Sequence, residues 1–498
     1  MAVARMFIAL ALLGTPVPVL AQHEGHGGAE AQAVPRGANP YERGLYLLHN
    51  FEYATAAAAF RDAQIADPSN VMAYWGEAMT YNHPLWAEQD AGAARAVLAR
   101  LGPDPASRRS KARSTKEAAW LGAVEALYGS GSKIERDAAY HERMRALFEA
   151  DRADIDARTF YALATLGLAS QGRDTALYMK SAALLEEAMP SHPDHPGLLH
   201  YMIHSYDDPA HAPLGERAAA RYAQVAPDAG HAQHMISHIY LALGRWNEVE
   251  RANVTASKLV NEQRAANGRP PTGCGHYNEW LAYALDQQGK DSRQLVESCR
   301  AEALAVAAKG EDKSALGVVR NPFNNWANIA VRHGVDTGNW PSVDSVSTGD
   351  RALLGRFALA YGRVLASRND AAAAGAALDE MKSYRSQIAA ALPVELPDDH
   401  ESAAWLDRAV AQGEAVVALA RGEQGLGIQL LHAAANVEAA LPVPFGPPVL
   451  AKPSAEMLGD ELLAKGRKAD AAAAYRQALA AAPNRRRSVE GLKASAAP

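Results

Sequence analysis

The sequence predicts an all-α protein built from repeated pairs of antiparallel helices that stack into a solenoid. Alanine is abundant, with AAAA runs at 56–59, 371–374 and 471–474, and aromatic residues make up only 7% of the 498 residues. This composition favours closely packed helices over strands. Two histidine pairs with four-residue spacing, at 200/204 and 234/238, are separated by 34 residues. Four-residue spacing places both rings on one helix face, and a fixed period of this length is typical of a repeated helix–turn–helix unit.

Composition and charge exclude several functional classes. The chain is 48% hydrophobic and 21% charged, which is enough apolar material for a large core. Its net charge is −6 and it has no long basic run, so nucleic acid is not an expected partner. No stretch after the N-terminus reaches 18 apolar residues, so we expect no transmembrane segment in the mature chain.

The N-terminus has the pattern of a secretory signal. Residues 1–21 contain Arg5, an apolar stretch from Met6 to Leu13, and small residues that end at Ala21. We expect cleavage after Ala21 and a periplasmic or secreted protein. Residues 22–39 are polar and rich in glycine and histidine, and we expect a disordered leader there.

Repeats begin near Pro40, and we assign 40–440 to the solenoid, with a histidine-rich core at 196–290. In the first unit Gly44, Ala56, Phe60 and Pro68 fall at positions 8, 20, 24 and 32 of a 34-residue repeat. A further helix is expected over 73–86. The proline-rich stretch 441–452 is predicted to be a linker to a last unit and cap at 453–490.

These offsets resemble the tetratricopeptide-repeat (TPR) superfamily, most clearly at 41–84, 196–290 and 453–484. Within that superfamily the chain is similar to exported bacterial histidine-rich TPR proteins, on the basis of HNFEY at 49–53, the 73–86 segment and the histidine-rich centre. The resemblance implies a right-handed superhelix whose first helices line a concave groove. It implies a peptide, protein or small-molecule ligand in that groove, and no particular activity.

In TPR units, positions 2, 5, 9, 12 and 13 of the first helix face the groove, and the helical period makes these positions one stripe. Ligand-type side chains gather on this stripe in three successive units. The residues predicted to bind metal are His200, His204, His231, His234, His238, His276 and Glu279. Further groove residues expected to contact a ligand are Trp75, His83, Asp207, Asp208, Tyr283 and Asp286.

Two imidazoles at i and i+4 point at one spot, as the paired histidines of HExxH zinc motifs do. Imidazoles with carboxylates and no thiolate suit zinc or copper, with iron and nickel as further choices. Since ordinary histidine titrates near pH 6.5, we expect a bound ion to be released around pH 5–6.

Two alternatives remain open at the level of sequence. The groove would serve a metal-dependent hydrolase or oxidoreductase if the ion keeps an open coordination position. It would serve an envelope scaffold if the histidines hydrogen-bond a partner peptide without metal. The chain has no GxSxG elbow and no phosphate-binding glycine loop, and the fold itself does not decide between the alternatives.

The chain has two cysteines, Cys274 and Cys299. Export permits a disulfide, and the repeat register places them on antiparallel neighbouring segments. A bridge and two separate buried thiols remain equal alternatives.

Overall fold

The structure, a computed structural model, describes residues 38–86, 88–169, 172–309, 322–341, 352–391 and 398–496. The signal predicted at 1–21 lies outside these residues. The leader predicted at 22–39 also lies outside them, apart from Ala38 and Asn39.

The predicted all-α fold is confirmed, because the described residues form 23 helices and one pair of two-residue strands. The first group comprises α1 (Pro40–His49), α2 (Tyr53–Ala66), α3 (Val71–Met79), α4 (Ala91–Leu101), α5 (Pro105–Arg109), α6 (Thr115–Leu127), α7 (Lys133–Ala150), α8 (Ile155–Leu166) and α9 (Thr175–Glu186). The central group comprises α10 (Pro196–Ser205), α11 (Ala212–Val225), α12 (Gly230–Ala242), α13 (Trp246–Ala266), α14 (His276–Gln287) and α15 (Arg293–Ala308). The last group comprises α16 (Pro322–Thr337), α17 (Leu353–Ala366), α18 (Ala371–Ala391), α19 (Asp398–Ala420), α20 (Gln424–Glu438), α21 (Ser454–Ala464), α22 (Lys468–Ala481) and α23 (Arg486–Ala496).

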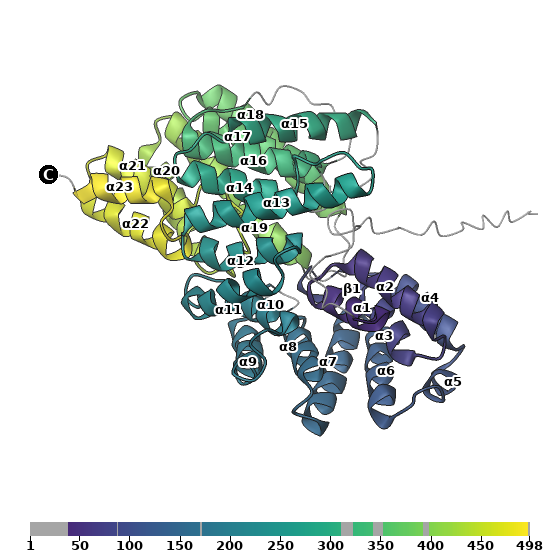
Figure 1. Cartoon of the computed structure of the whole chain (residues 1–498). Coiled ribbons are helices and arrows are strands. Elements are labelled where there is room, and N and C mark those ends of the chain that lie inside the picture. The colour runs from purple at the N-terminus through teal and green to yellow at the C-terminus, as the bar shows by residue number, and fades with distance from the viewer. Residues whose placement is uncertain are drawn as a thin grey trace, which may run out of the picture.

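Consecutive helices pack as antiparallel pairs, and each pair stacks on the next to form a TPR-like solenoid. In Figure 1 the purple and blue helices α1–α9 and the later teal to yellow helices form two groups, joined through α10–α12. The helices that carry the histidines therefore lie at the middle of the molecule.

The spacing between glycine and aromatic residues explains the close helix packing at both ends of the chain. A Cβ at Gly44 or Gly76 would lie 2.7 or 2.3 Å from the Phe60 ring, so this ring fits only between two glycines. Tyr475 lies in the same way between Gly459 and Gly491, where a Cβ would approach the ring to 2.8 or 2.2 Å. In both cases the glycines lie 16 residues before and 16 residues after the aromatic residue, so two distant repeats pack in the same way.

The helix expected over 73–86 ends at Met79. Asn82–His83 (β1) and Glu88–Gln89 (β2) form a short antiparallel pair, with a 3₁₀ turn at Pro84–Trp86 between them. Pro84 has no N–H and disfavours helical geometry at the residue before it, so the helix stops short of His83.

A long helix and a loop precede the third histidine-bearing unit. Helix α13 has 21 residues and ends at Ala266, and a loop then leads to Gly275. The loop ends at the disulfide between Cys274, just before α14, and Cys299 on α15. Of the two alternatives left by the sequence, the structure has the bridge.

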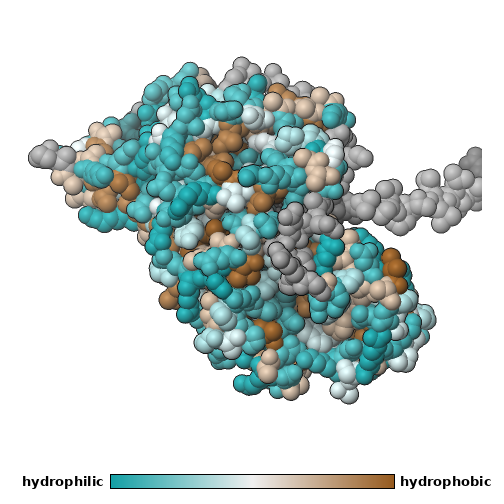
Figure 2. Space-filling view, in the orientation of Figure 1, coloured by the Kyte–Doolittle hydropathy of each residue, from teal (hydrophilic) through white to brown (hydrophobic). Residues whose placement is uncertain are grey.

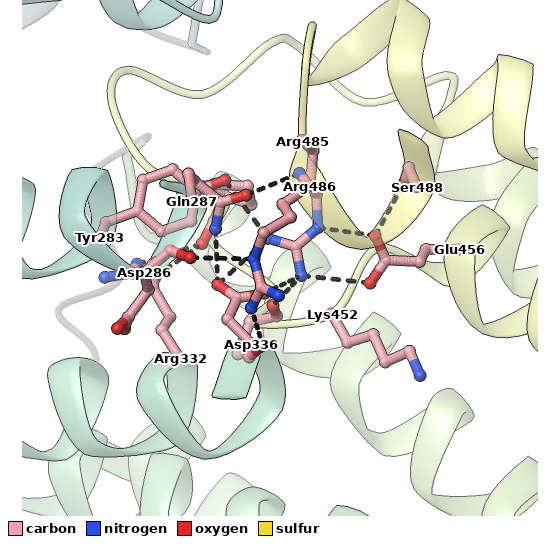
Figure 3. Close-up of polar contacts among 12 residues, drawn as sticks. Tyr283, Asp286, Gln287, Arg332, Asp336, Lys452, Glu456, Arg485, Arg486 and Ser488 are labelled. Atoms are coloured by element: carbon pink, nitrogen blue, oxygen red, sulfur yellow. Dashed lines mark hydrogen bonds and ion pairs between the residues drawn. The ribbon is translucent and has the colours of Figure 1, made fainter. Parts of the chain in front are cut away.

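The C-terminal unit docks onto α16 through the buried guanidinium of Arg485 (Figure 3). It donates to Asp336 on α16 at 2.7 Å and to Glu456 on α21 at 2.8 Å, and all three side chains are at most 1% exposed. Neighbouring contacts extend this junction. Trp246 Nε1 donates to the Asn484 carbonyl at 3.0 Å, and the Arg486 amide donates to Gln287 at 2.9 Å.

Hydrophilic residues cover most of the face shown in Figure 2, and hydrophobic residues form separate small patches on it. Among the described residues, no helix is both long and apolar enough to cross a membrane.

The first prediction concerns the Arg485 junction. Replacing Arg485 with methionine leaves two buried carboxylates without their counter-charge, and breaking a buried pair in this way costs about 3–5 kcal/mol. Hydrogen exchange should show the free energy for local opening of α21–α23 falling by that amount. Arg467→Met is the control, since its pair with Asp470 is about half-exposed and worth less than about 1 kcal/mol. Equal exchange in the two variants would contradict the role given to Arg485.

The second prediction compares one substitution at two glycines. Gly459→Ala should destabilise the last unit by about 1–3 kcal/mol, because its Cβ would overlap the Tyr475 ring. Gly425→Ala meets nothing within 4 Å and should be neutral or stabilising by up to about 1 kcal/mol. Chemical denaturation followed by circular dichroism measures both changes, and a loss at Gly425 equal to that at Gly459 would refute the packing argument.

Candidate metal centre

Six imidazoles from three successive first helices lie together at the centre of the solenoid. We call them the histidine cluster: His200 and His204 on α10, His231, His234 and His238 on α12, and His276 on α14. Five of them are buried, and His276 is exposed. The structure thus brings together the six histidines that the sequence predicts to bind metal.

On the α10 side of the cluster, two Nε2 atoms approach the Nε2 atom of His200. His204 Nε2 lies 3.2 Å from His200 Nε2, and His231 Nε2 lies 3.3 Å from the same atom. The four-residue step along α10 sets the first contact, and the stacking of α12 on α10 sets the second.

The α12 side repeats this arrangement. His238 Nε2 lies 3.2 Å from His234 Nε2. One ring nitrogen each of His234, His238 and His276 lies within 4.8 Å of the other two. His204 and His238 link the two sides, with ring centroids 5.7 Å apart.

The Nδ1 atoms of three of the six rings, those of His200, His234 and His238, face hydrogen-bond acceptors, whereas the buried His204 Nδ1 does not. His200 Nδ1 is 2.7 Å from the His49 carbonyl oxygen, and His238 Nδ1 is 2.5 Å from an Asp207 carboxylate oxygen. His234 Nδ1 is 2.7 Å from Asn253 Oδ1, and the amide is oriented by its NH₂ donating to the Val249 carbonyl at 2.8 Å. In each case the imidazole must donate from Nδ1, which leaves a lone pair on Nε2 in the neutral ring.

With this tautomer, the unprotonated Nε2 atoms of His234 and His238 face each other. Two lone pairs that face each other at 3.2 Å repel unless a cation lies between them. Tetrahedral zinc with Zn–N bonds near 2.0–2.1 Å separates its nitrogen ligands by roughly 3.3 Å. The nitrogens therefore have the spacing of metal ligands, and oxygen acceptors orient the rings as they do around bound metals.

Burial also keeps the imidazoles on the α10 side neutral. Burial lowers the pKa of His200 to about 3, and burial and the neighbouring imidazoles hold the pKa of His204 well below its ordinary value. The expectation that metal is released around pH 5–6 used the ordinary pKa of histidine. Because protons compete less well for these rings, release is now expected at a lower pH.

Aromatic rings pack against the cluster on two sides. Phe51 packs against His200 with the rings tilted and their centroids 4.3 Å apart, and it has a backbone φ of 56°. A bulky residue in this region is strained, and such strain is concentrated at functional sites. Trp280 contacts His234 and His238 with centroid distances of 4.7 and 4.4 Å.

The proline-rich segment predicted as a linker at 441–452 packs against α9, α14 and α16. The Phe445 ring lies 4.6 Å from the Arg173 guanidinium, and the Pro448 carbonyl accepts from Arg332 at 3.1 Å. Gly446 has a φ of 86°, and a Cβ there would lie 2.5 Å from the Trp280 ring. The segment thus supports the tryptophan that covers the α12 side of the cluster.

Three predicted site residues of α14 make contacts outside the cluster. Glu279 forms an ion pair with Arg332 and is absent from the two three-residue groups of adjacent ligand atoms found among the described residues. Asp286 accepts from Ser292 at 2.6 Å and contacts His333, and the Tyr283 hydroxyl contacts Arg485 at 3.3 Å. These side chains belong to the junction drawn in Figure 3 and its surroundings.

The remaining predicted ligand contacts are distributed over other sites. Asp207 orients His238, whereas Asp208 pairs with Arg173 and His211. His83 bonds to the Thr80 carbonyl at 3.1 Å and to Glu88 at 3.2 Å. Trp75 lines a separate cavity of about 310 Å³ together with other first-helix residues.

A second group of ligand-type atoms comprises His49, Asp156 and His195. His195 is the N-cap of α10 and its Nδ1 accepts from the Leu198 amide, so its Nε2 donates to Asp156 at 3.2 Å. His49 Nε2 lies 3.0 Å from the same carboxylate oxygen. Ordinary hydrogen bonds with a carboxylate acceptor account for this group, in contrast to the facing acceptors of the histidine cluster.

Sequence reasoning missed several residues that shape the centre. Asn253 lies on the second helix of its unit, at the position where Phe60 and Tyr475 lie in theirs. A polar residue at that packing position was the available signal. The His49 carbonyl and the Phe51 backbone strain leave no signal of this kind, because both depend on how α1 approaches α10.

The comparisons with known proteins give distant structural likeness only. No family model matches the chain, and no curated protein matches its sequence. The human IFIT1 dimer with m7Gppp-AAAA is 12% identical with a TM-score of 0.36, covering 94% of this chain and 95% of that one. The TPR domain of P58(IPK) is 12% identical with a TM-score of 0.21, covering 92% and 96%. Naa15/Naa10 bound to HypK-THB is 12% identical with a TM-score of 0.19, covering 90% and 64%.

A buried carboxyl beside the cluster gives a pH prediction for the metal-free protein. Burial raises the pKa of Glu52 to about 8, although the His231 amide bonds to it. Between pH 4.5 and 8 the unfolded chain therefore releases a proton that the folded chain keeps. As the pH rises through this range, the free energy of unfolding should therefore fall by about 1.4 kcal/mol per pH unit because of Glu52.

Glu52→Gln removes this titration, so the variant should lose that slope and gain most over wild type at pH 8. Denaturation midpoints at pH 5 and pH 8 provide the measurement. Glu149→Gln, at a residue about half-exposed beside Arg145, should parallel wild type. A gain from Glu52→Gln that is the same at both pH values would rule out a buried neutral carboxyl.

Proposed function

We propose that this chain is an exported TPR-like protein whose histidine cluster binds a transition-metal ion, with zinc or copper as the best match. The carrying observation is the His234–His238 contact. Their Nε2 atoms lie 3.2 Å apart, while both Nδ1 atoms face oxygen acceptors. Imidazole-only donors suit zinc and copper.

Export is supported by the signal-like pattern at 1–21 and by the disulfide between Cys274 and Cys299. Disulfides persist in oxidising compartments such as the periplasm. We therefore assign the protein to the periplasm or the extracellular space. Fractionation of expressing cells would test this, and a chain that keeps residues 1–21 and stays in the cytoplasm would refute it.

The TPR-like fold also supports a peptide, protein or small-molecule ligand on the concave side. The cavity beside Trp75 is lined by first helices α1, α3, α6 and α8 and carries both aromatic and charged side chains. The metal centre would then be one part of a longer binding surface.

The test combines metal analysis with a double substitution. Wild-type protein at pH 7.5, dialysed against zinc or copper and then against metal-free buffer, should retain metal and show a higher Tm than the metal-free form. His204→Ala with His238→Ala should abolish both effects and keep the helical circular dichroism signal.

The matched control is His192→Ala with His432→Ala, which removes two histidines outside the cluster and should retain full metal. A wild-type protein without metal after dialysis would reject the proposal. So would a His204/His238 double variant at full occupancy, because the metal would then be held elsewhere, with His23 and His26 as the first residues to examine.

A metal-dependent enzyme is the second candidate, favoured by one observation. His276 is exposed beside buried His234 and His238, so a three-imidazole site would open toward solvent on that side. Catalytic zinc sites keep such an open position. Cobalt-substituted protein should change its visible absorption on adding azide if the position is open, and an unchanged spectrum would favour a closed binding site.

A further inference from the structure

The cluster divides into two sets of three according to the repeat. Counting from Pro196, Gly230 and Gly275 as position 1, His200 and His234 occupy position 5, and His204 and His238 occupy position 9. His231 and His276 occupy position 2 of the unit that follows. Each set therefore consists of positions 5 and 9 of one repeat and position 2 of the next.

We propose that the chain binds two metal ions in adjacent, repeat-related sites. One site is formed by His200, His204 and His231, and the other by His234, His238 and His276. This inference rests on the proposed function and specifies its stoichiometry and its arrangement.

Two contacts are common to the two sets, whereas only the second set has all three ligand atoms within 4.8 Å of one another. The position 5 and position 9 nitrogens are 3.2 Å apart in both, at His200–His204 and His234–His238. The position 5 ring donates from Nδ1 to an oxygen on another element in both, 2.7 Å away, at the His49 carbonyl and at Asn253. Two unrelated residues thus perform the same orienting role, as expected if both sets hold an ion.

The two sites differ in access. His200, His204 and His231 are each at most 4% exposed, and Phe51 packs against this set. The second set includes exposed His276. We therefore expect the α12–α14 site to exchange its ion with solvent faster than the α10–α12 site.

The two metal ions would lie close to each other, because the two sites are adjacent. His204 and His238, one from each set, have ring centroids 5.7 Å apart. The six imidazoles are neutral when they bind metal, and Asp207 reaches only His238. The ions repel each other through a poorly screened interior, so the second ion should bind more weakly than the first.

Zinc stoichiometry tests the proposal in the full chain carrying His23→Ala and His26→Ala, which removes the leader histidines from the count. At saturation this protein should retain two zinc ions per chain. His231→Ala and His276→Ala should each retain one, and the two substitutions together should retain none. Circular dichroism checks the fold of each variant.

The outcomes separate the two claims. No zinc in the parent protein overturns the proposed function. One zinc in the parent, lost by either single substitution, leaves metal binding in place and overturns the two-site inference. If buried His231→Ala fails to fold, the comparison uses His276→Ala, for which loss of one of two ions supports the inference and loss of both or neither overturns it.

Copper gives a second readout that reports on distance. With Cu(II) at two equivalents, electron paramagnetic resonance should show dipolar broadening or loss of signal between neighbouring ions. His276→Ala loaded with one equivalent should show a single narrow spectrum. Two bound copper ions that give an unbroadened spectrum in the parent would show that the sites are not adjacent, and would overturn the arrangement.

Discussion

The buried guanidinium of Arg485 is the interaction that joins the last unit of this solenoid to its earlier helices. A TPR-like array needs only nearest-neighbour contacts, and its last repeat would ordinarily end in solvent. Here the final unit returns to the central helices, where Arg485 neutralises Asp336 and Glu456 at the junction. The 441–453 segment crosses beside this junction and supports Trp280, so the cover of the histidine cluster depends on the same contact.

Histidine is used in two chemically distinct ways within a few residues of chain. His195 caps α10 and, with His49, surrounds the Asp156 carboxylate, so the hydrogen-bond needs of those rings are met by protein atoms. Three rings of the histidine cluster, those of His200, His234 and His238, instead donate outward from Nδ1 and direct the Nε2 lone pair at a neighbouring imidazole. Proximity of ligand-type atoms is common to both groups, and the tautomer imposed by the outer acceptors distinguishes them.

Features that follow from the repeat period could be predicted from the sequence, whereas contacts between segments far apart in the chain could not. The 34-residue offset predicted that His200, His204, His234 and His238 face one another, because equivalent positions of stacked repeats share a surface. It also placed Glu279 on the same stripe, but Arg332 from α16 holds that carboxylate. Arg485, Arg486 and Arg487 look alike in the sequence, and only the fold shows that Arg485 is the fully buried one. Phe51 and the His49 carbonyl likewise matter only once α1 lies against α10.

The repeat-related placement of the histidines has a mechanical consequence. Each set of three spans the boundary between two stacked repeats, so an ion held there would fix the rotation of one repeat relative to the next. In a solenoid the small rotation per repeat determines curvature over the whole length. Ions at α10–α12 and α12–α14 would thus stiffen the superhelix at its midpoint and hold the concave surfaces of its two halves at a set angle. The shape of the concave surface that a distant ligand contacts would then depend on whether metal is bound.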